Sequence, residues 1–309
     1  MKNNKTEKNN TNAKRLIYTA VVIIIILVPT VVSLQFYFSS QGSPKAAIID
    51  QLGSSKLDAT VRDENQTFIE ATEELLHKRF SVVDYYSDNA TVEEYKQLAS
   101  EDYKLIIWRA HTGLDLDSDY VAIAATDRID TADYGQYDGQ YLQYLENGQL
   151  TFDNITGDPQ SLYFSITPKF IEQVMTGTFQ DTVIVLMGCN GLSPGYLKTA
   201  EAFEAKGAKV FISWNGWISP SDNDYGGTLL LQYLINENDT VSTATSKIPV
   251  FNSEFGQAQL LYDPPTVANY RIPDYTEHDG SQQDAFITIV PSRKRTPSIT
   301  SWNSEVGIL

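Results

Sequence analysis

Short apolar runs alternate along most of this chain with segments whose apolar residues recur at helical spacing. Five runs have the length and composition of buried strands: 46–49, 82–86, 105–108, 183–187 and 209–213. Four segments carry the helical pattern: 68–80, 92–98, 196–206 and 227–235. Strands that alternate with helices are typical of a parallel sheet with crossover helices. The sequence therefore predicts an α/β three-layer sandwich, with a mostly parallel central sheet flanked by helices.

A segment of different character, from about 114 to 167, interrupts this alternation. It contains Asn147-Gly148 between two β-prone segments, which is the signal of a type I′ hairpin, so we expect an antiparallel insertion. Four tyrosines precede the dipeptide, and we interpret them as half-buried hairpin residues, with a recognition loop as the alternative: Tyr134, Tyr137, Tyr141 and Tyr144. Three aspartates open the segment without the glycine and glutamate spacing of an EF-hand, which favours an acidic loop over a calcium site: Asp115, Asp117 and Asp119.

The N-terminus has the pattern of a membrane anchor. Residues 16–38 are apolar and carry no charge, and at about 1.5 Å per residue they span the roughly 30 Å of a bilayer core. We expect one transmembrane helix there; a cleaved signal peptide is the alternative, but the run exceeds a signal peptide's usual apolar length. The basic leader 1–15 should stay cytoplasmic, which places the main domain outside the membrane. A linker 39–45 joins the anchor to this domain, 46–291, and a polar tail follows at 292–309.

Charge and composition narrow the classes of partner. The 309-residue chain has a net charge of −16 and 42% hydrophobic residues, enough for a sizeable core. So acidic a surface repels nucleic acid, and we exclude that partner. Four sequons are compatible with an exported glycoprotein: Asn65, Asn89, Asn154 and Asn238. The sequence does not indicate an oligomeric state.

Two chemically reactive residues follow strand-like runs. Cys189 is the only cysteine and comes two residues after 183–187, while His111 comes three residues after 105–108. In open α/β sheets ligands bind outside the carboxyl ends of strands, so we expect both side chains in a ligand-binding position. A thiol paired with an imidazole is the minimum set for nucleophilic catalysis, although a lone cysteine is more often a small core residue.

Other catalytic systems fit the sequence less well. The three histidines and one cysteine have no zinc-ligand spacing, and there is neither a phosphate-binding nor a dinucleotide-binding glycine motif. A serine-hydrolase G-x-S-x-G elbow is also missing. We therefore expect neither a metal nor a cofactor.

The combination of strand-Ala-His-x-Gly with strand-Gly-Cys-Asn-Gly, followed by KGAKVFISWNGWISPSDND at 206–224, resembles the caspase-fold cysteine peptidases. The group contains caspases, legumain, separase, gingipains and CHAT-type domains, and the last two look most similar. The resemblance covers about 46–235. It differs from the family pattern in Thr112, which separates the histidine from its glycine, and in a longer interval from histidine to cysteine. No arginine cluster for an acidic P1 residue is present, so caspase specificity is not expected.

This resemblance implies a function and residue roles. Cys189 would be the nucleophile and His111 the general acid/base, and the backbone N–H of Cys189, with one from Thr112 or Gly113, would stabilise the oxyanion. The substrate would be a polypeptide. The competing interpretation is an inactive domain of the same fold that serves as a cell-surface binding module.

The segment after 209–213 suggests a substrate pocket. Trp214, Asp222 and Asp224 supply an aromatic wall and two carboxylates, which predicts a site for arginine or lysine at P1. The alternative is that both aspartates cap the following helix.

Overall fold

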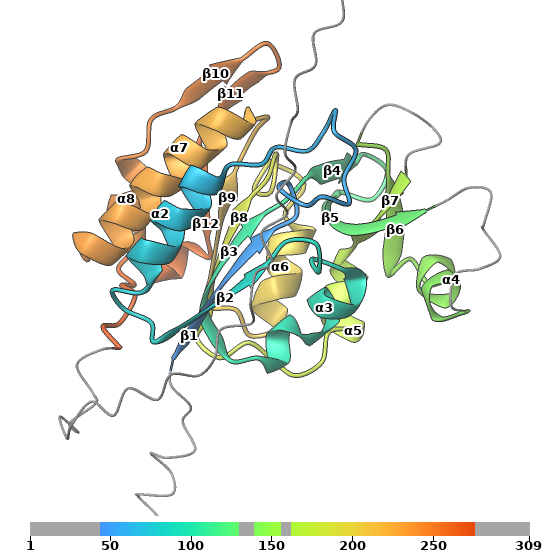
Figure 1. The fold of residues 1–309 in the computed structure, drawn as a ribbon, viewed down its shortest axis with the longest axis horizontal. Coiled ribbons are helices and arrows are strands. Elements are labelled where there is room, and N and C mark those ends of the chain that lie inside the picture. The colour runs from blue at the N-terminus through green and yellow to red at the C-terminus, as the bar shows by residue number, and fades with distance from the viewer. Residues whose placement is uncertain (1–43, 130–138, 156–161, 276–309) are drawn as a thin grey trace, which may run out of the picture. The chain divides into compact units, whose positions relative to one another are not determined.

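The computed structural model describes residues 44–129, 139–155 and 162–275 (Figure 1). The predicted anchor 16–38, the tail 292–309 and two of the insertion's tyrosines lie outside the described residues. Within those residues, no helix is long and apolar enough to cross a membrane.

A six-stranded sheet forms the centre of the fold. Its order is β12-β9-β8-β3-β1-β2, and all neighbours pair in parallel except β12, which runs antiparallel to β9. The strands are β1 (Lys45–Asp50), β2 (Val82–Tyr86), β3 (Tyr103–Arg109), β8 (Val183–Met187), β9 (Val210–Trp214) and β12 (Leu260–Asp263). The first five confirm the five predicted strands. Because β3 and β8 are parallel neighbours, the residues that follow them lie side by side at the carboxyl-terminal ends of the strands.

Helices cover both faces of this sheet (Figure 1). One face carries α3 (Val92–Gln97), α5 (Pro168–Gln173) and α6 (Lys198–Ala205), and the other carries α2 (Gln66–Leu76), α7 (Pro220–Leu231) and α8 (Val241–Ser246). Strand residues alternate between the two cores: in β3, Ile106 and Trp108 pack on the first side, and Leu105 and Ile107 on the second. The structure is thus a mixed α/β fold with a mostly parallel sheet.

Several helix boundaries follow from local capping. Asn65 accepts a hydrogen bond from Phe68 N–H and so begins α2, while Ser219 and Pro220 begin α7. The helix predicted from 227 therefore starts seven residues earlier, at Pro220. It continues after Leu231 as a π-helical turn, Gln232–Asn236. Short 3₁₀ turns occupy Leu98–Ser100 and Pro265–Val267, and a hairpin, β10 (Phe251–Ser253) and β11 (Gly256–Ala258), precedes β12.

The insertion is antiparallel as expected, with the strand order β4-β5-β7-β6. Its strands are β4 (Thr112–Asp115), β5 (Tyr120–Ile129), β6 (Leu150–Asp153) and β7 (Leu162–Ile166). The predicted hairpin at Asn147-Gly148 is wrong, because the preceding segment is a helix, α4 (Gly139–Glu146). Tyr141 and Tyr144 lie one helical turn apart and pack on Phe164 and Phe170. Gly148, at φ +68°, follows the helix in the left-handed conformation that also ends helices.

Candidate functional site

Cys189 lies on a tight turn that follows β8. Asn190, the next residue, has φ +63°, a left-handed conformation that turns the chain sharply after the cysteine. Gly188 has no room for a side chain, since a Cβ atom there would lie 2.6 Å from Thr112 Cγ2 and 2.8 Å from the Ala110 carbonyl oxygen. The glycine therefore allows the end of β8 to approach the segment that follows β3.

His111 follows β3 and is held by the loop 51–65 that comes after β1. Its backbone N–H donates to Gln51 Oε1 at 3.0 Å, and its Nε2 lies 2.9 Å from the Val61 carbonyl oxygen. Burial lowers the pKa of the imidazole by more than the Val61 hydrogen bond raises it, and the neighbouring Arg109 guanidinium has a smaller lowering effect. At neutral pH the ring is therefore uncharged and able to accept a proton.

Thr112 joins the two segments. Its Oγ1 donates to the Cys189 carbonyl oxygen at 2.5 Å, which ties the histidine segment to the cysteine turn. The Cys189 side chain itself contacts a third segment, because Sγ lies 3.5 Å from the Ile218 N and 3.6 Å from the Ile218 carbonyl oxygen. Burial raises the pKa of the thiol, so it is protonated at neutral pH.

The thiol and the imidazole are turned toward different loops. Within the described part of the chain, Sγ bonds to the loop after β9 and the imidazole to the loop after β1, and no hydrogen bond joins the two side chains. In the sheet order these loops lie on opposite sides of the β8–β3 pair. Direct contact is not required at rest, because catalytic hydrogen bonds often tighten only when substrate binds.

The predicted oxyanion donors differ in their availability. Ala124 N–H donates to the carbonyl of His111, the residue that it faces, so these two form a hydrogen-bonded pair. Because such pairs alternate with pairs that lack mutual backbone hydrogen bonds, Gly113 is hydrogen-bonded to Ala122, whereas Thr112 and Ile123 are not bonded to each other. Thr112 N–H therefore points away from β5. Cys189 N–H likewise has no hydrogen-bond partner among the residues the structure describes. Of the two candidates after the histidine, Thr112 is therefore the one whose backbone N–H has no partner in the part of the chain that the structure describes.

The predicted substrate pocket is largely internal. Trp214 is 1% exposed and donates from Nε1 to Asn223 Oδ1 at 2.7 Å. Asp224 is 4% exposed and binds Arg109. Asp222 lies in the first turn of α7, where the N-cap Ser219 donates its hydroxyl to the carboxylate at 2.8 Å. Neither Trp214 nor Asp224 reaches solvent in this conformation, and Asp222 is bonded within the helix cap.

The aromatic side chain that is exposed in this loop is Trp217, at 48%. Its ring packs on that of Phe255 in the β10–β11 hairpin, with the ring centroids 5.4 Å apart, and Phe255 is 68% exposed. Trp217 directly precedes Ile218, which holds the cysteine sulfur. The exposed pair of Trp217 and Phe255 therefore lies next to Ile218, the residue that contacts the sulfur of Cys189.

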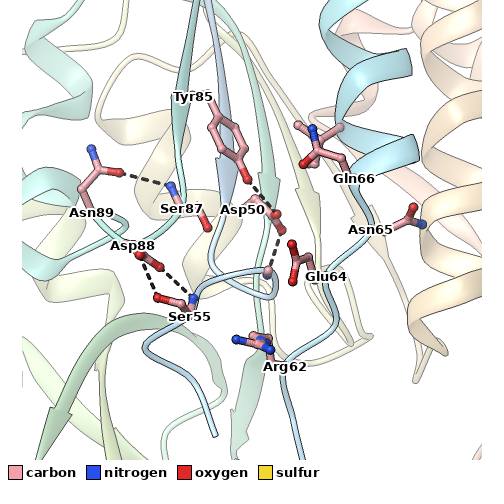
Figure 2. A pocket seen from close by; sticks show the side chains of 12 residues that line it. Asp50, Ser55, Arg62, Glu64, Asn65, Gln66, Tyr85, Ser87, Asp88 and Asn89 are labelled. Carbon is pink, nitrogen blue, oxygen red and sulfur yellow. Dashed lines mark hydrogen bonds between the residues drawn. The ribbon is translucent and has the colours of Figure 1, made fainter. Parts of the chain in front are cut away.

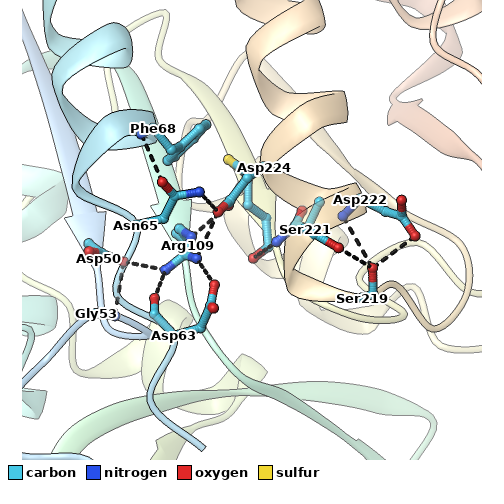
Figure 3. Close-up of polar contacts among 12 residues, drawn as sticks. Asp50, Gly53, Asp63, Asn65, Phe68, Arg109, Ser219, Ser221, Asp222 and Asp224 are labelled. Carbon is cyan, nitrogen blue, oxygen red and sulfur yellow. Dashed lines mark hydrogen bonds and ion pairs between the residues drawn. The ribbon is translucent and has the colours of Figure 1, made fainter.

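A buried ionic cluster around Arg109, which sequence reasoning missed, supports the site (Figure 3). All five guanidinium N–H donors are used: two bind the Asp224 carboxylate at 2.7 and 2.9 Å, one binds Asp50 at 2.9 Å, and two bind the carboxylate and the carbonyl of Asp63. Burial raises the pKa of the Asp50 carboxyl despite the arginine beside it. The cluster ties β1, β3, α7 and the loop that holds His111 together. The sequence feature that could have indicated this cluster is Arg109 itself, a charged residue at the end of a largely apolar strand.

Asp153 is a second residue that the sequence did not single out. One of its carboxylate oxygens lies 2.8 Å from the position that a Cβ atom on Gly113 would occupy. Burial raises the pKa of this carboxyl to about 6, and it has no hydrogen bond or ion pair within the described residues. Two strands separate β6 from β4 in the sheet order, so no local pattern encodes the proximity of Asp153 to Gly113.

A pocket of about 360 Å³ opens beside the Arg109 cluster, at the carboxyl ends of β1 and β2 (Figure 2). Asp50, at its edge, accepts a hydrogen bond from Tyr85 Oη at 3.2 Å, and Asp88 binds the backbone and hydroxyl of Ser55. Arg62 and Glu64 also line it. The pocket lies on the β1–β2 side of the loop that holds His111, whereas Cys189 follows β8 on the other side of β3.

Within the described residues, no group of three or more His, Cys, Asp or Glu side chains is arranged to hold a metal ion. No protein-family model matches the chain, and no curated protein matches it either.

Proposed function

We propose that this protein is a membrane-anchored, extracytoplasmic cysteine peptidase of the caspase-fold group, closest to gingipain and CHAT-type members, with Cys189 as nucleophile and His111 as general acid/base. The observation that carries the proposal is the pair of backbone donors, Cys189 N–H and Thr112 N–H, on two segments joined by the Thr112 hydroxyl. Two preorganised donors beside a nucleophile are what acyl transfer requires, and each is worth roughly 2.7–4 kcal/mol.

The residues support the following sequence of steps. The Cys189 sulfur attacks the peptide carbonyl while His111 accepts the thiol proton, and the two N–H groups bind the developing oxyanion. His111 then gives that proton to the leaving amine, and an acyl-enzyme remains on the sulfur. Water, deprotonated by the same imidazole, releases the acid and restores the thiol. For this cycle both side chains must leave their resting partners, Val61 and Ile218, when the substrate binds.

We further propose that the substrates contain basic residues, including at P1. The support is the net charge of −16, which attracts cationic peptides, and Asp222 at the start of α7 beside the Trp217 loop. Because Trp214 and Asp224 are buried, they would support the Trp217 loop from within the protein.

A second candidate function is an inactive, membrane-tethered binding module. The resting hydrogen bonds of Cys189 and His111 to the backbone of different loops favour it, because they are the contacts that two satisfied structural residues would make.

Active-site labelling separates the two functions. The purified full-length chain, kept in a mild detergent, is treated with peptidyl acyloxymethyl ketones bearing Arg, Lys, Asp or Leu at P1, and the adduct is read by intact mass. We expect an adduct on Cys189 with the Arg and Lys probes that is lost in His111→Ala and in Cys189→Ala. If no probe reacts while a small maleimide still modifies the thiol, the peptidase proposal is refuted and the binding module stands.

A further inference from the structure

β4 is an edge strand that begins at the candidate site. Among the described residues it pairs only with β5 in the insertion sheet, so within that part of the chain one of its edges has no neighbouring strand. Val121 of β5 faces Leu114 of β4, and both its N–H and its C=O bond to the hydroxyl of Thr199. Leu114 and Val121 therefore form a pair without mutual backbone hydrogen bonds, and such pairs alternate with hydrogen-bonded pairs along an antiparallel ladder. The N–H and C=O groups of Thr112 and Leu114 therefore point away from β5.

These edge groups are available to a ligand. Residues 112–115 are all partly exposed, and the Thr112 N–H is the donor assigned above to the oxyanion. An exposed strand edge is a ready template for an extended peptide, which adds as a further strand through main-chain hydrogen bonds. A substrate whose P1 carbonyl is bound by Thr112 thus continues naturally along β4.

Gly113 and Asp153 decide what side chain fits there. The Asp153 carboxylate occupies the space in which Gly113 would carry a side chain. In a paired strand the residue facing Gly113 directs its side chain to the same face, with its Cβ about 4.5–5.5 Å from the glycine position. That side chain would therefore meet the carboxylate of Asp153.

We propose that the free edge of β4 binds the peptide substrate as an added strand, and that Asp153 selects lysine or arginine at the substrate position facing Gly113. This inference rests on the proposed peptidase function. Thr112 N–H binds the P1 carbonyl. In an antiparallel substrate Thr112 therefore faces P1 and Gly113 faces P2, whereas in a parallel substrate, where an N–H donates to the residue before the one it faces, Thr112 faces P1′ and Gly113 faces P2′.

The charges of the site agree with this choice. Asp153 is partly buried and has no cation or hydrogen-bond donor beside it in the described structure, so a basic ligand side chain would supply the partner that it lacks there. Burial raises the pKa of the carboxyl to about 6, which leaves it largely ionised at neutral pH. A cationic side chain would pair with it, whereas an acidic one would be repelled.

Cleavage profiling tests the inference. The full-length chain and its Asp153→Asn variant, which keeps the shape and removes the charge, digest a synthetic library of twelve-residue peptides, and mass spectrometry reads the residues on both sides of each cut. Asp117→Asn is the matched control, because it removes an equal charge from an exposed position of the same insertion. We expect at least tenfold enrichment of Lys and Arg at P2 or P2′, or about 1.4 kcal/mol. Asp153→Asn should lose this enrichment while still cleaving, and Asp117→Asn should retain it.

The other outcomes overturn the inference and remain distinct from one another. Cleavage without basic enrichment at P2 or P2′, or with enrichment that persists in Asp153→Asn, refutes the role of Asp153 and leaves the peptidase function standing. If the wild-type chain neither cleaves the library nor reacts with the ketone probes, the peptidase function itself fails and this inference falls with it.

Discussion

Replacing Arg109 with methionine should destabilise the protein more than any other single change at the site. The methionine keeps a similar length but removes all five N–H donors that serve Asp50, Asp63 and Asp224. The arginine side chain is 0% exposed, and those of Asp50 and Asp224 are 2% and 6% exposed. Two buried carboxylates would thus lose their counterion.

The burial of these side chains sets the expected loss in the free energy of unfolding. Removing one partner of a buried ion pair costs about 3–5 kcal/mol, because the remaining charge is left without compensation. The third carboxylate, Asp63, is 40% exposed on its side chain, so water can replace its partner. Asp63→Asn is therefore the matched control, and its cost should be about 1 kcal/mol or less.

The loss in Arg109→Met should also depend on pH. Without the arginine, the pKa of Asp50, which burial already raises in the folded protein, rises further above its value in the unfolded chain. The folded state then holds protons that the unfolded state releases, so its free energy of unfolding falls as pH rises above about 4. Destabilisation should thus be smaller at pH 5 than at pH 7.5.

Urea unfolding of the full-length chain, followed by far-UV circular dichroism at both pH values, measures these differences. A loss below about 1 kcal/mol for Arg109→Met at pH 7.5, or an equal loss for Asp63→Asn, would refute the view that the cluster is held by buried charge compensation.

Three further changes test other parts of the structure. Thr112→Val removes the hydroxyl that joins the two loops, so labelling of the nucleophile by the peptidyl ketones should slow about tenfold, with at most about 1 kcal/mol lost in urea unfolding. Burial and a hydrogen bond with Asp263 raise the pKa of Glu204 to about 7, so the folded protein retains a proton that the unfolded chain loses between about pH 4.5 and 7. The free energy of unfolding should fall as pH rises through that window, and Glu204→Gln should flatten the dependence. A Cβ atom on Gly216 would lie 2.4 Å from the Gln257 carbonyl oxygen, so Gly216→Ala should cost about 1–3 kcal/mol and speed alkylation of the thiol by iodoacetamide, because the loop that covers it must shift.

The sequence by itself determined the central sheet. Parallel strands buried on both faces are nearly continuous apolar runs, so 183–187 was predicted with the same bounds that the structure has for β8. The repeated strand-helix order predicted parallel pairing. Parallel pairing places His111 and Cys189 at the carboxyl-terminal ends of their strands, on the same end of the sheet. The Asn147-Gly148 signal failed because the same dipeptide can end a helix, and the helical spacing of Tyr141 and Tyr144 was the competing evidence.

Only the tertiary structure decided the surroundings of the site. Arg109 and Asp224 are 115 residues apart in sequence, and Asp153 lies beside Gly113 although two strands separate β6 from β4 in the sheet order. The directions of the Cys189 and His111 side chains depend likewise on loops that follow other strands. Secondary structure is readable from sequence because neighbouring residues determine it, whereas these contacts depend on the path of the whole chain, which no local pattern specifies.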